Sequence, residues 1–206
     1  MSFLRHDKLD EKMKLQEIAS VRSGLVLSRK QSKESTDYRY PLINLRCVQP
    51  DGAINLNDSD IYEAKEPLKE EYLSRRGDIV VRLTAPYTAV LIDDTTSGMV
   101  ISSNFVMIRI EDKQLIPEYL FWLLNTPQVR HKIYENATSN MLGAVKAKFL
   151  ANFEVTLLPV EVQKEIAQLN LLSKMEGRLL KELAEEKEKL YSYLLNQAYR
   201  SAKKGK

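Results

Sequence analysis

The C-terminal quarter of the chain constrains the fold most, because residues 159–206 carry the pattern of one long helix. Pro159 suits a first helical position, and Glu161 and Glu165 place negative charge near the positive end of the helix dipole. The other end carries positive charge, on Arg200, Lys203, Lys204 and Lys206. About 43 helical residues, each rising about 1.5 Å, would form a rod roughly 65 Å long. A compact domain of this size has a radius of about 17 Å, so we expect much of the rod to extend beyond it.

Apolar residues recur along this stretch at three- and four-residue steps, which is the spacing of one stripe on a helix. The pattern is not a regular zipper, because Glu176 and Glu186 fall at seam positions of the heptad. Such charged breaks favour an antiparallel pairing, in which each Glu can meet a Lys or Arg of the facing helix. The predicted contact residues on the stripe are Leu169, Leu172, Leu179, Leu183, Leu190, Tyr193 and Leu194.

The rest of the chain predicts a β-rich domain with short helices, so the expected fold class is α+β, with a domain over residues 1–158 and the long helix over 159–206. Val- and Ile-rich runs bounded by turn residues predict strands. The expected strands cover residues 21–27, 42–48, 78–84, 88–93, 99–110 and 153–158. A short helix is expected at 8–20 and two more from Pro117 onward, where the period becomes helical. Gly24 interrupts the first strand and indicates a bulge or a close approach of backbone.

The composition of the chain indicates its cellular compartment and the kind of partner that it could bind. The lone Cys47 cannot form an internal disulfide, the start lacks an apolar signal core, and no long uncharged apolar run predicts a membrane span, so we expect a cytosolic protein. The net charge of +3 is uneven, since residues 51–100 hold five Lys or Arg against ten Asp or Glu. A modest basic excess is compatible with a nucleic-acid binder that concentrates charge on one face.

Catalytic motifs are mostly absent: there is no phosphate-cradling loop, no dinucleotide fingerprint, no nucleophile elbow and no Cys or His pair at zinc spacing. One loose match remains. Asp51, Glu63 and Lys65 satisfy the spacing of metal-dependent nucleases, in which two carboxylates hold Mg²⁺ and a lysine orients water. In those nucleases the second carboxylate sits on a buried strand, whereas here the surrounding segment is charged and contains Pro67. A nuclease, and a coiled-coil protein that binds no nucleic acid, are the alternatives.

Several segments, in this order and spacing, resemble the specificity (S) subunit of type I restriction-modification systems. They are LQEIASVRSG, YPLINLRCVQPDGAIN, RRGDIVVRLTAP, ISSNFVMIRI, PEYLFWLLN and FEVTLLPVEVQKEIAQLN. The resemblance covers nearly the whole chain and implies that residues 1–158 form a DNA target-recognition domain and residues 159–206 a spacer and dimerisation helix. It also implies double-stranded DNA and the methyltransferase (M) and restriction (R) subunits as partners, with no metal, cofactor or catalysis in this chain.

The chain departs from the family in holding one recognition domain and one spacer helix, where a full-length member has two of each. We therefore expect a half-subunit that forms a homodimer through its helix and rebuilds the two-domain arrangement. Such a symmetric dimer would read a bipartite, palindromic target with half-sites about one helical turn, about 34 Å, apart.

Recognition loops cannot be carried over from the family residue by residue, so the DNA-contacting residues are predicted from their chemistry. Lysines suit phosphates, Arg and Asn suit guanine and adenine edges, and aromatic rings suit stacking or edge contacts. For the polar segment 28–40 the alternative is a solvated hairpin loop, and Arg82 is alternatively an outward-facing strand residue. The predicted set is Arg22, Arg29, Lys30, Lys33, Tyr38, Arg39, Tyr40, Arg82, Thr84, Tyr87, Ser139, Asn140, Lys146 and Lys148.

Overall fold

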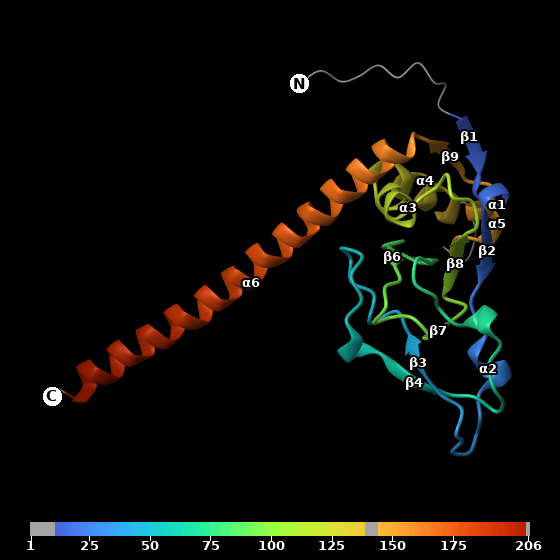
Figure 1. Cartoon of the computed structure of the whole chain (residues 1–206). Coiled ribbons are helices and arrows are strands. Elements are labelled where there is room, and N and C mark those ends of the chain that lie inside the picture. Colours follow the sequence, from blue (N-terminus) through green and yellow to red (C-terminus); the bar gives the residue numbers. More distant parts are fainter. Residues whose placement is uncertain (1–10, 139–143, 205–206) are drawn as a thin grey trace, which may run out of the picture. The chain divides into compact units, whose positions relative to one another are not determined.

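The computed structural model describes residues 11–138 and 144–204 of the 206-residue chain. It divides the chain into two compact units, Met1–Ala167 and Gln168–Lys206. Figure 1 shows the first unit as a mixed assembly of strands and short helices, and the second as part of a single helix, α6. The α+β fold class expected from the sequence is confirmed, including the long C-terminal helix.

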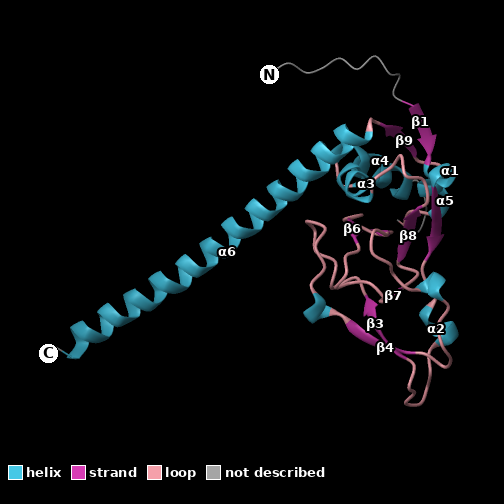
Figure 2. Ribbon diagram, viewed as in Figure 1, coloured by secondary structure: helices cyan, strands magenta, loops and turns pink. Residues whose placement is uncertain are grey.

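The first unit is built on a four-stranded antiparallel sheet with the strand order β2-β8-β5-β6 (Figure 2). These strands are β2 (Ala19–Ser23), β8 (Phe105–Ile110), β5 (Ile79–Arg82) and β6 (Ala89–Leu91). Side chains alternate across the sheet, so Ile79 and Val81 enter one hydrophobic core while Val80 enters another. Both faces of the sheet are covered, which explains why the sequence of β5 is a continuous apolar run.

Helices cover one face of the sheet and form what we call the helix-side core. They are α3 (Pro117–Leu124), α4 (Pro127–Thr138) and α5 (Ala147–Ala151). Pro117 stands in the first turn of α3, where its missing N–H costs nothing. Leu120 and Leu124 of α3 and Ile133 of α4 are fully buried in this core. The two helices expected from Pro117 onward are therefore confirmed.

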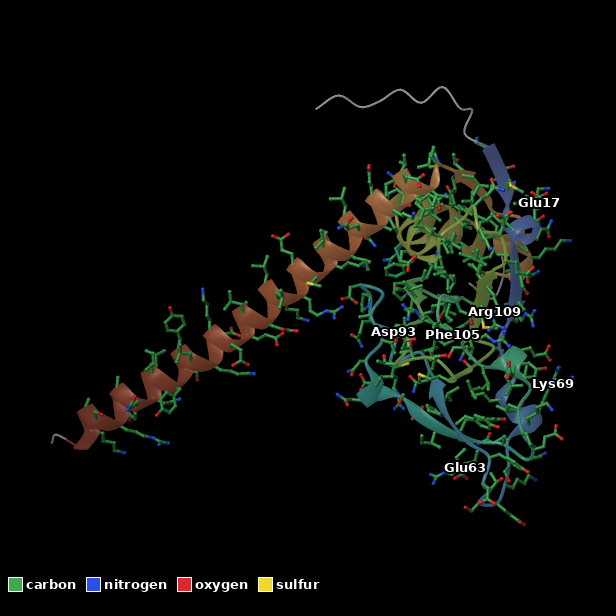
Figure 3. The ribbon with its side chains drawn as sticks, viewed as in Figure 1. Glu17, Glu63, Lys69, Asp93, Phe105 and Arg109 are labelled. Atoms are coloured by element: carbon green, nitrogen blue, oxygen red, sulfur yellow. The ribbon has the colours of Figure 1, made fainter. Side chains whose placement is uncertain are left out.

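The opposite face is covered by irregular chain and forms the loop-side core, to which Ile43, Cys47 and Phe105 belong (Phe105 is labelled in Figure 3). Burial raises the pKa of the Cys47 thiol. A second sheet adjoins this region, in the order β4-β3-β7, with β4 (Asp60–Glu63), β3 (Arg39–Ile43) and β7 (Val100–Ile101). Two short 3-10 helices, η1 (Leu56–Asp58) and η2 (Glu70–Tyr72), and the helical turn α2 (Leu27–Lys30) complete the segment.

A two-stranded ribbon brings the beginning of the described chain beside the segment that enters the long helix. Strand β1 (Glu11–Lys14) pairs antiparallel with β9 (Glu154–Leu157), and the turn α1 (Leu15–Ile18) follows β1. Helix α6 (Val160–Lys204) then runs for 45 residues. Its first two turns belong to the first unit, where Gln163 and Ala167 are buried. No helix in the described parts of the chain is both long and apolar enough to cross a membrane, and the cytosolic location stays a prediction.

Some expected elements are wrong in extent. The helix predicted at 8–20 is a strand followed by one helical turn in the described residues, because β9 pairs with 11–14 and fixes an extended backbone. The strand predicted at 42–48 ends at Ile43. The side-chain oxygen of Asn44 there accepts hydrogen bonds from the N–H groups of Arg46 (2.8 Å) and Cys47 (3.0 Å), which turns the chain.

Three further differences arise from contacts between distant segments. Strand β4 lies in an acidic stretch where the sequence predicted no strand, and it forms because it pairs with β3. The strand predicted at 99–110 is two strands separated by a turn, since β7 pairs with β3 whereas β8 pairs with β2 and β5. Helix α5 is a third helix after Pro117, where the sequence predicted two, and it packs against β2, which is distant in sequence.

Candidate nucleic-acid interface

The structure separates the predicted DNA-contacting residues into two groups. The first, which we call the α2–β3 group, contains Arg29, Lys30, Lys33, Tyr38, Arg39 and Tyr40. This segment lies against the end of β4, because the N–H of Ser32 donates to Glu63 O and the N–H of Lys65 donates to Lys30 O, both at 2.9 Å. The N–H of Ala64 likewise donates to Tyr38 O at 2.9 Å.

Carboxylates neutralise much of the α2–β3 group. Lys30 forms an ion pair with Glu66, and Arg39 Nε lies 3.3 Å from a carboxylate oxygen of Glu63, which is labelled in Figure 3. The hydrogen bond between Lys30 and Glu66 raises the pKa of the lysine and lowers the pKa of the glutamate. Residues 29–40 and 60–72 together hold six Lys or Arg against seven Asp or Glu. This surface is therefore poorly suited to a run of phosphate contacts.

The two tyrosines of the α2–β3 group and the nearby Arg22 differ in how far they are engaged by neighbouring side chains and backbone. The Tyr40 hydroxyl accepts the N–H of Leu68 at 3.2 Å, so that tyrosine is half-buried, whereas Tyr38 is exposed. Arg22 on β2 donates to the Ser20 hydroxyl from Nη2 (2.7 Å) and Nε (3.2 Å), and its Nη1 lies 3.7 Å from a Glu71 oxygen. Tyr38 is thus the aromatic ring of this group that is open to a stacking partner.

The second group lies at one end of the central sheet, where four segments distant in sequence meet. The N–H of Leu83 donates to Asn104 O (3.0 Å), and the N–H of Val145 donates to Leu83 O (2.9 Å). The N–H of Ser103 donates to Leu25 O (2.8 Å). We call this region the sheet-end surface and define it as residues 23–25, 82–88, 102–104 and 144–148. It brings together the predicted residues Arg82, Thr84, Lys146 and Lys148.

The charge of the sheet-end surface differs from that of the α2–β3 group. Its four segments contain three cations, Arg82, Lys146 and Lys148, and no Asp or Glu. None of these cations forms an ion pair with a carboxylate in the part of the chain that the structure describes. Both lysines are exposed. The surface therefore offers positive charge to a polyanion without competing carboxylates.

Arg82 is held in place by the surrounding chain. It ends β5 and is half-buried; its Nε donates to the Thr84 hydroxyl at 3.3 Å, and its Nη1 donates to Leu45 O at 3.4 Å. A guanidinium has five N–H donors, so these two contacts leave donors free for a ligand. An arginine fixed in this way loses less conformational freedom on binding.

Tyr87, also in the predicted set, is buried. It is 6% exposed and belongs to the helix-side core, so its ring is not available for stacking on a base. Its ring meets Tyr134 of α4 edge to face, with centroids 6.5 Å apart. It has a backbone φ of 55°. Tyr87 therefore anchors the loop after β5. The predicted residues Ser139 and Asn140 lie outside the described residues.

Ser103 and Asn104 also belong to the sheet-end surface but are absent from the predicted set. They lie in the turn between β7 and β8. Residues 99–110 were expected to form one strand, so no loop was predicted at these polar residues. A Ser-Ser-Asn run inside an otherwise apolar strand is itself a turn signal that could have located them.

Both carboxylates of the nuclease alternative have partners in the structure. Asp51 accepts the N–H of Ala53 at 3.0 Å within its turn, and Glu63 on β4 pairs with Arg39. Over residues 11–138 and 144–204, no group of three or more His, Cys, Asp or Glu side chains is placed to hold a metal ion.

Comparison with known proteins identifies the family. The model of the type I restriction modification DNA specificity domain matches residues 9–189, which is most of the chain. None of the curated proteins matches it. Among solved structures, one similar chain comes from a study of complex assembly and conformational transition of the type I R-M system, with 17% identity and a TM-score of 0.63. That match covers 84% of this chain and 45% of the other.

Two further structures have the same fold. The HsdS subunit from Thermoanaerobacter tengcongensis has 18% identity and a TM-score of 0.57, over 86% of this chain and 42% of that one. The type I restriction-modification S subunit from M. genitalium has 13% identity and a TM-score of 0.55, over 84% and 41% respectively. The chain thus spans less than half the length of each of these three structures. From the family match over residues 9–189, the chain belongs to the type I restriction modification DNA specificity domain family.

Proposed function

We propose that this chain binds double-stranded DNA sequence-specifically and serves as the specificity subunit of a type I restriction-modification system. In this role it directs partner M and R subunits to a bipartite target and performs no catalysis itself. The observation that carries the proposal is the sheet-end surface: a carboxylate-free cluster of Arg82, Lys146 and Lys148 on the fold of a DNA specificity domain.

The division of labour within the sheet-end surface follows from its chemistry. Exposed lysines on flexible stems suit phosphate oxygens, and each phosphate contact releases condensed counterions. We assign this role to Lys146 and Lys148. An arginine held by its neighbours suits a base edge, where two parallel N–H groups can meet O6 and N7 of guanine. We assign that role to Arg82, which Thr84 and Leu45 O position.

The proposal includes a homodimer formed through α6. From Gln168 onward this helix presents apolar side chains that are 46–68% exposed, at the positions predicted for a seam: Leu169, Leu172, Leu179, Leu183, Leu190, Tyr193 and Leu194. Covering such a stripe with a second helix removes apolar area from water and stabilises the pair. Glu176 and Glu186 interrupt the seam, which favours an antiparallel arrangement. Two chains paired in this way present two DNA-reading units to the two halves of a bipartite site.

Binding of a mixed-sequence duplex over a series of salt concentrations tests the DNA role. Affinity should fall steeply with salt, by about 0.9 in log K per log salt unit for each phosphate contacted. The double variant Lys146→Ala/Lys148→Ala should bind more weakly and lower the slope by nearly 2 if each lysine holds one phosphate. The matched control, Lys65→Ala/Lys69→Ala, removes two exposed lysines from the carboxylate-rich segment and should leave the slope unchanged. Absence of salt-dependent binding would favour a coiled-coil protein without nucleic acid.

Light scattering tests the dimer. The wild-type chain should show a concentration-dependent dimer, and Leu183→Glu should shift it to monomer by placing a charge in the seam. Ser192→Glu is the matched control, because nine residues are two and a half turns at about 3.6 residues per turn and place it on the opposite face. A wild-type monomer at all concentrations contradicts the dimer and leaves the DNA proposal standing.

Co-expression with M subunits tests the assignment to the restriction system. We expect methylation of a bipartite sequence only when this chain and an M subunit are both present. Methylation by this chain alone would contradict the non-catalytic role.

A further inference from the structure

The turn between β7 and β8 carries an uncommitted side-chain amide at the sheet-end surface. Asn104 is exposed, and its amide makes no hydrogen bond within the part of the chain described here. Three asparagines near the two sheets have side-chain partners: Asn44 bonds Asp58 O and Asp60, Asn55 bonds Asp58, and Asn125 bonds Ala89 and Arg130. Asn104 therefore keeps both the donor and the acceptor of its amide available to a ligand.

The backbone fixes the position of Asn104. Its carbonyl accepts the N–H of Leu83 at 3.0 Å, and Phe105, the next residue, stands opposite Arg82 in the β5–β8 register. On the other side of the turn, Ser103 N–H donates to Leu25 O at 2.8 Å and Phe105 N–H donates to Ser102 O at 3.0 Å. The turn is thus bonded on both sides, and the backbone of Asn104 lies beside Leu83, the residue that follows Arg82.

Gly24 makes this arrangement possible by letting two backbones touch. A Cβ atom at Gly24 would stand 2.3 Å from Ser102 O and 2.4 Å from Ile101 O. The start of the turn is therefore packed against backbone, so Asn104 is presented from a rigid support. A polar side chain on a rigid support can discriminate between bases, because little of its binding energy is spent on ordering it.

We propose that Asn104 is a specificity-determining residue that reads an adenine edge in the DNA half-site next to the base read by Arg82. This inference rests on the proposed DNA-binding function. In the major groove an asparagine accepts a hydrogen bond from adenine N6 and donates one to adenine N7. No carboxylate of the sheet-end surface competes for its amide. A paired contact of this kind discriminates between bases by roughly ten- to a hundredfold.

Selection from a duplex pool tests the proposal without knowledge of the target. The full chain is incubated with duplexes randomised over a central window, and the bound fraction is sequenced. The wild type should enrich one motif. Asn104→Ala should lose the adenine preference at one position of each half-site, with the other positions and the binding of mixed-sequence DNA at high protein concentration retained. Asn104→Asp should also lose the preference, since a carboxylate cannot donate to N7.

The control is Asn57→Ala, which removes another exposed asparagine, located on η1 beside acidic residues, and should leave the enriched motif unchanged. Fluorescence of the single Trp122, which packs near Tyr119 in the same unit, reports whether each variant is folded. Should Asn104→Ala fail to fold, Asn104→Ser replaces it in the same selection, because serine keeps a turn-forming side chain.

The outcomes separate the two proposals. If the wild type retains no duplex, the proposed function fails. If the wild type enriches a motif and Asn104→Ala enriches the same one, the role of Asn104 is overturned while the DNA-binding function stands. An equal loss of affinity for all sequences in Asn104→Ala also overturns it, because that result describes a contact to phosphate.

Discussion

Asp78 and Arg109 form a two-pronged ion pair at the end of the central sheet where β5 begins, with Nε–Oδ1 and Nη2–Oδ2 distances of 2.8 and 2.7 Å. Asp78 is 2% exposed and the Arg109 side chain 19%. The N–H of Arg75 also donates to Asp78 Oδ2 at 2.8 Å, and Arg109 Nη2 donates to Leu73 O at 3.2 Å. The hydrogen bond to Asp78 raises the pKa of Arg109. The pair, whose arginine is labelled in Figure 3, fastens residues 73–78 to β8.

Removing the Asp78 carboxylate should destabilise the chain strongly. In Asp78→Ala the half-buried guanidinium of Arg109 loses its ion-pair partner, and breaking such a pair costs about 3–5 kcal/mol. Urea unfolding followed by Trp122 fluorescence measures the loss. The control is Asp94→Ala, whose partner Arg76 is 73% exposed while Asp94 is 75% exposed, and which should change stability by no more than about 0.5 kcal/mol. Equal midpoints for the two variants would show that the pair of Asp78 and Arg109 does not stabilise this end of the sheet.

Two glycines should respond in opposite ways to the same substitution. Gly24→Ala places a Cβ within 2.4 Å of two carbonyl oxygens, so backbone must move, at a cost of about 1–3 kcal/mol or more. Gly177 in α6 has nothing within 4 Å of a Cβ, and Gly177→Ala should favour the helix by about 1 kcal/mol. Trp122 fluorescence follows the first unit, and far-UV circular dichroism follows α6. A Gly24→Ala chain as stable as the wild type would contradict the close backbone contact.

Patterns within a short stretch of sequence were sufficient to predict those elements whose conformation depends mainly on neighbouring residues. The expected close approach at Gly24 is confirmed, as are the apolar runs of β5 and β6 and the helical period from Pro117. Helix α6 was predictable because a charged start, a basic end and a stripe are all written within one stretch. Elements whose conformation depends on distant partners were missed: β1 needs β9, and β4 needs β3.

The candidate site could likewise be predicted only in part, because contacts with distant segments decide which of its residues are available. The sequence correctly marked segment 28–40 as basic, but Lys30 and Arg39 are neutralised by Glu66 and Glu63, carboxylates from another strand and its following loop. Tyr87 looked like a loop residue, and packing against Tyr134 placed it in the core. Composition along the chain shows which charges exist, and only the fold shows which of them face each other.

Gln163 should anchor the start of α6 to the first unit. Its buried side chain donates from Nε2 to Gln114 O (2.7 Å) and Leu158 O (2.8 Å), and its Oε1 accepts the N–H of Ile116 at 3.0 Å. Gln163→Ala leaves these backbone groups without their partner, and we expect a loss of about 2–4 kcal/mol in urea unfolding. Gln168→Ala, at an exposed position of the same helix, is the control and should change stability by no more than about 0.5 kcal/mol. A small effect of Gln163→Ala would mean that water replaces the amide.

The Asp93 carboxylate gathers four hydrogen bonds on one oxygen. Oδ1 accepts from the N–H groups of Thr95 and Thr96, both at 3.0 Å, and from both threonine hydroxyls at 2.8 Å. Burial alone would raise the pKa of this carboxyl, but the hydrogen bonds outweigh it and the pKa lies below its usual value. A depressed pKa means that the folded state holds the proton less tightly than the unfolded chain. The stabilisation is therefore present above the unfolded pKa of about 3.9 and is lost as pH falls through the lower folded value.

Replacing Asp93 should flatten the acid limb of the stability curve. The urea midpoint of the wild type should fall between about pH 5 and pH 2.5, and Asp93→Asn should fall less over the same range because it has no proton to take up. At pH 7 the variant should be less stable than the wild type, since a neutral amide oxygen is a weaker acceptor than a carboxylate. Asp37→Asn, which alters an exposed carboxylate in the loop before β3, is the control and should keep the wild-type acid dependence. Parallel pH curves for Asp93→Asn and the wild type would show that this turn does not contribute to acid unfolding.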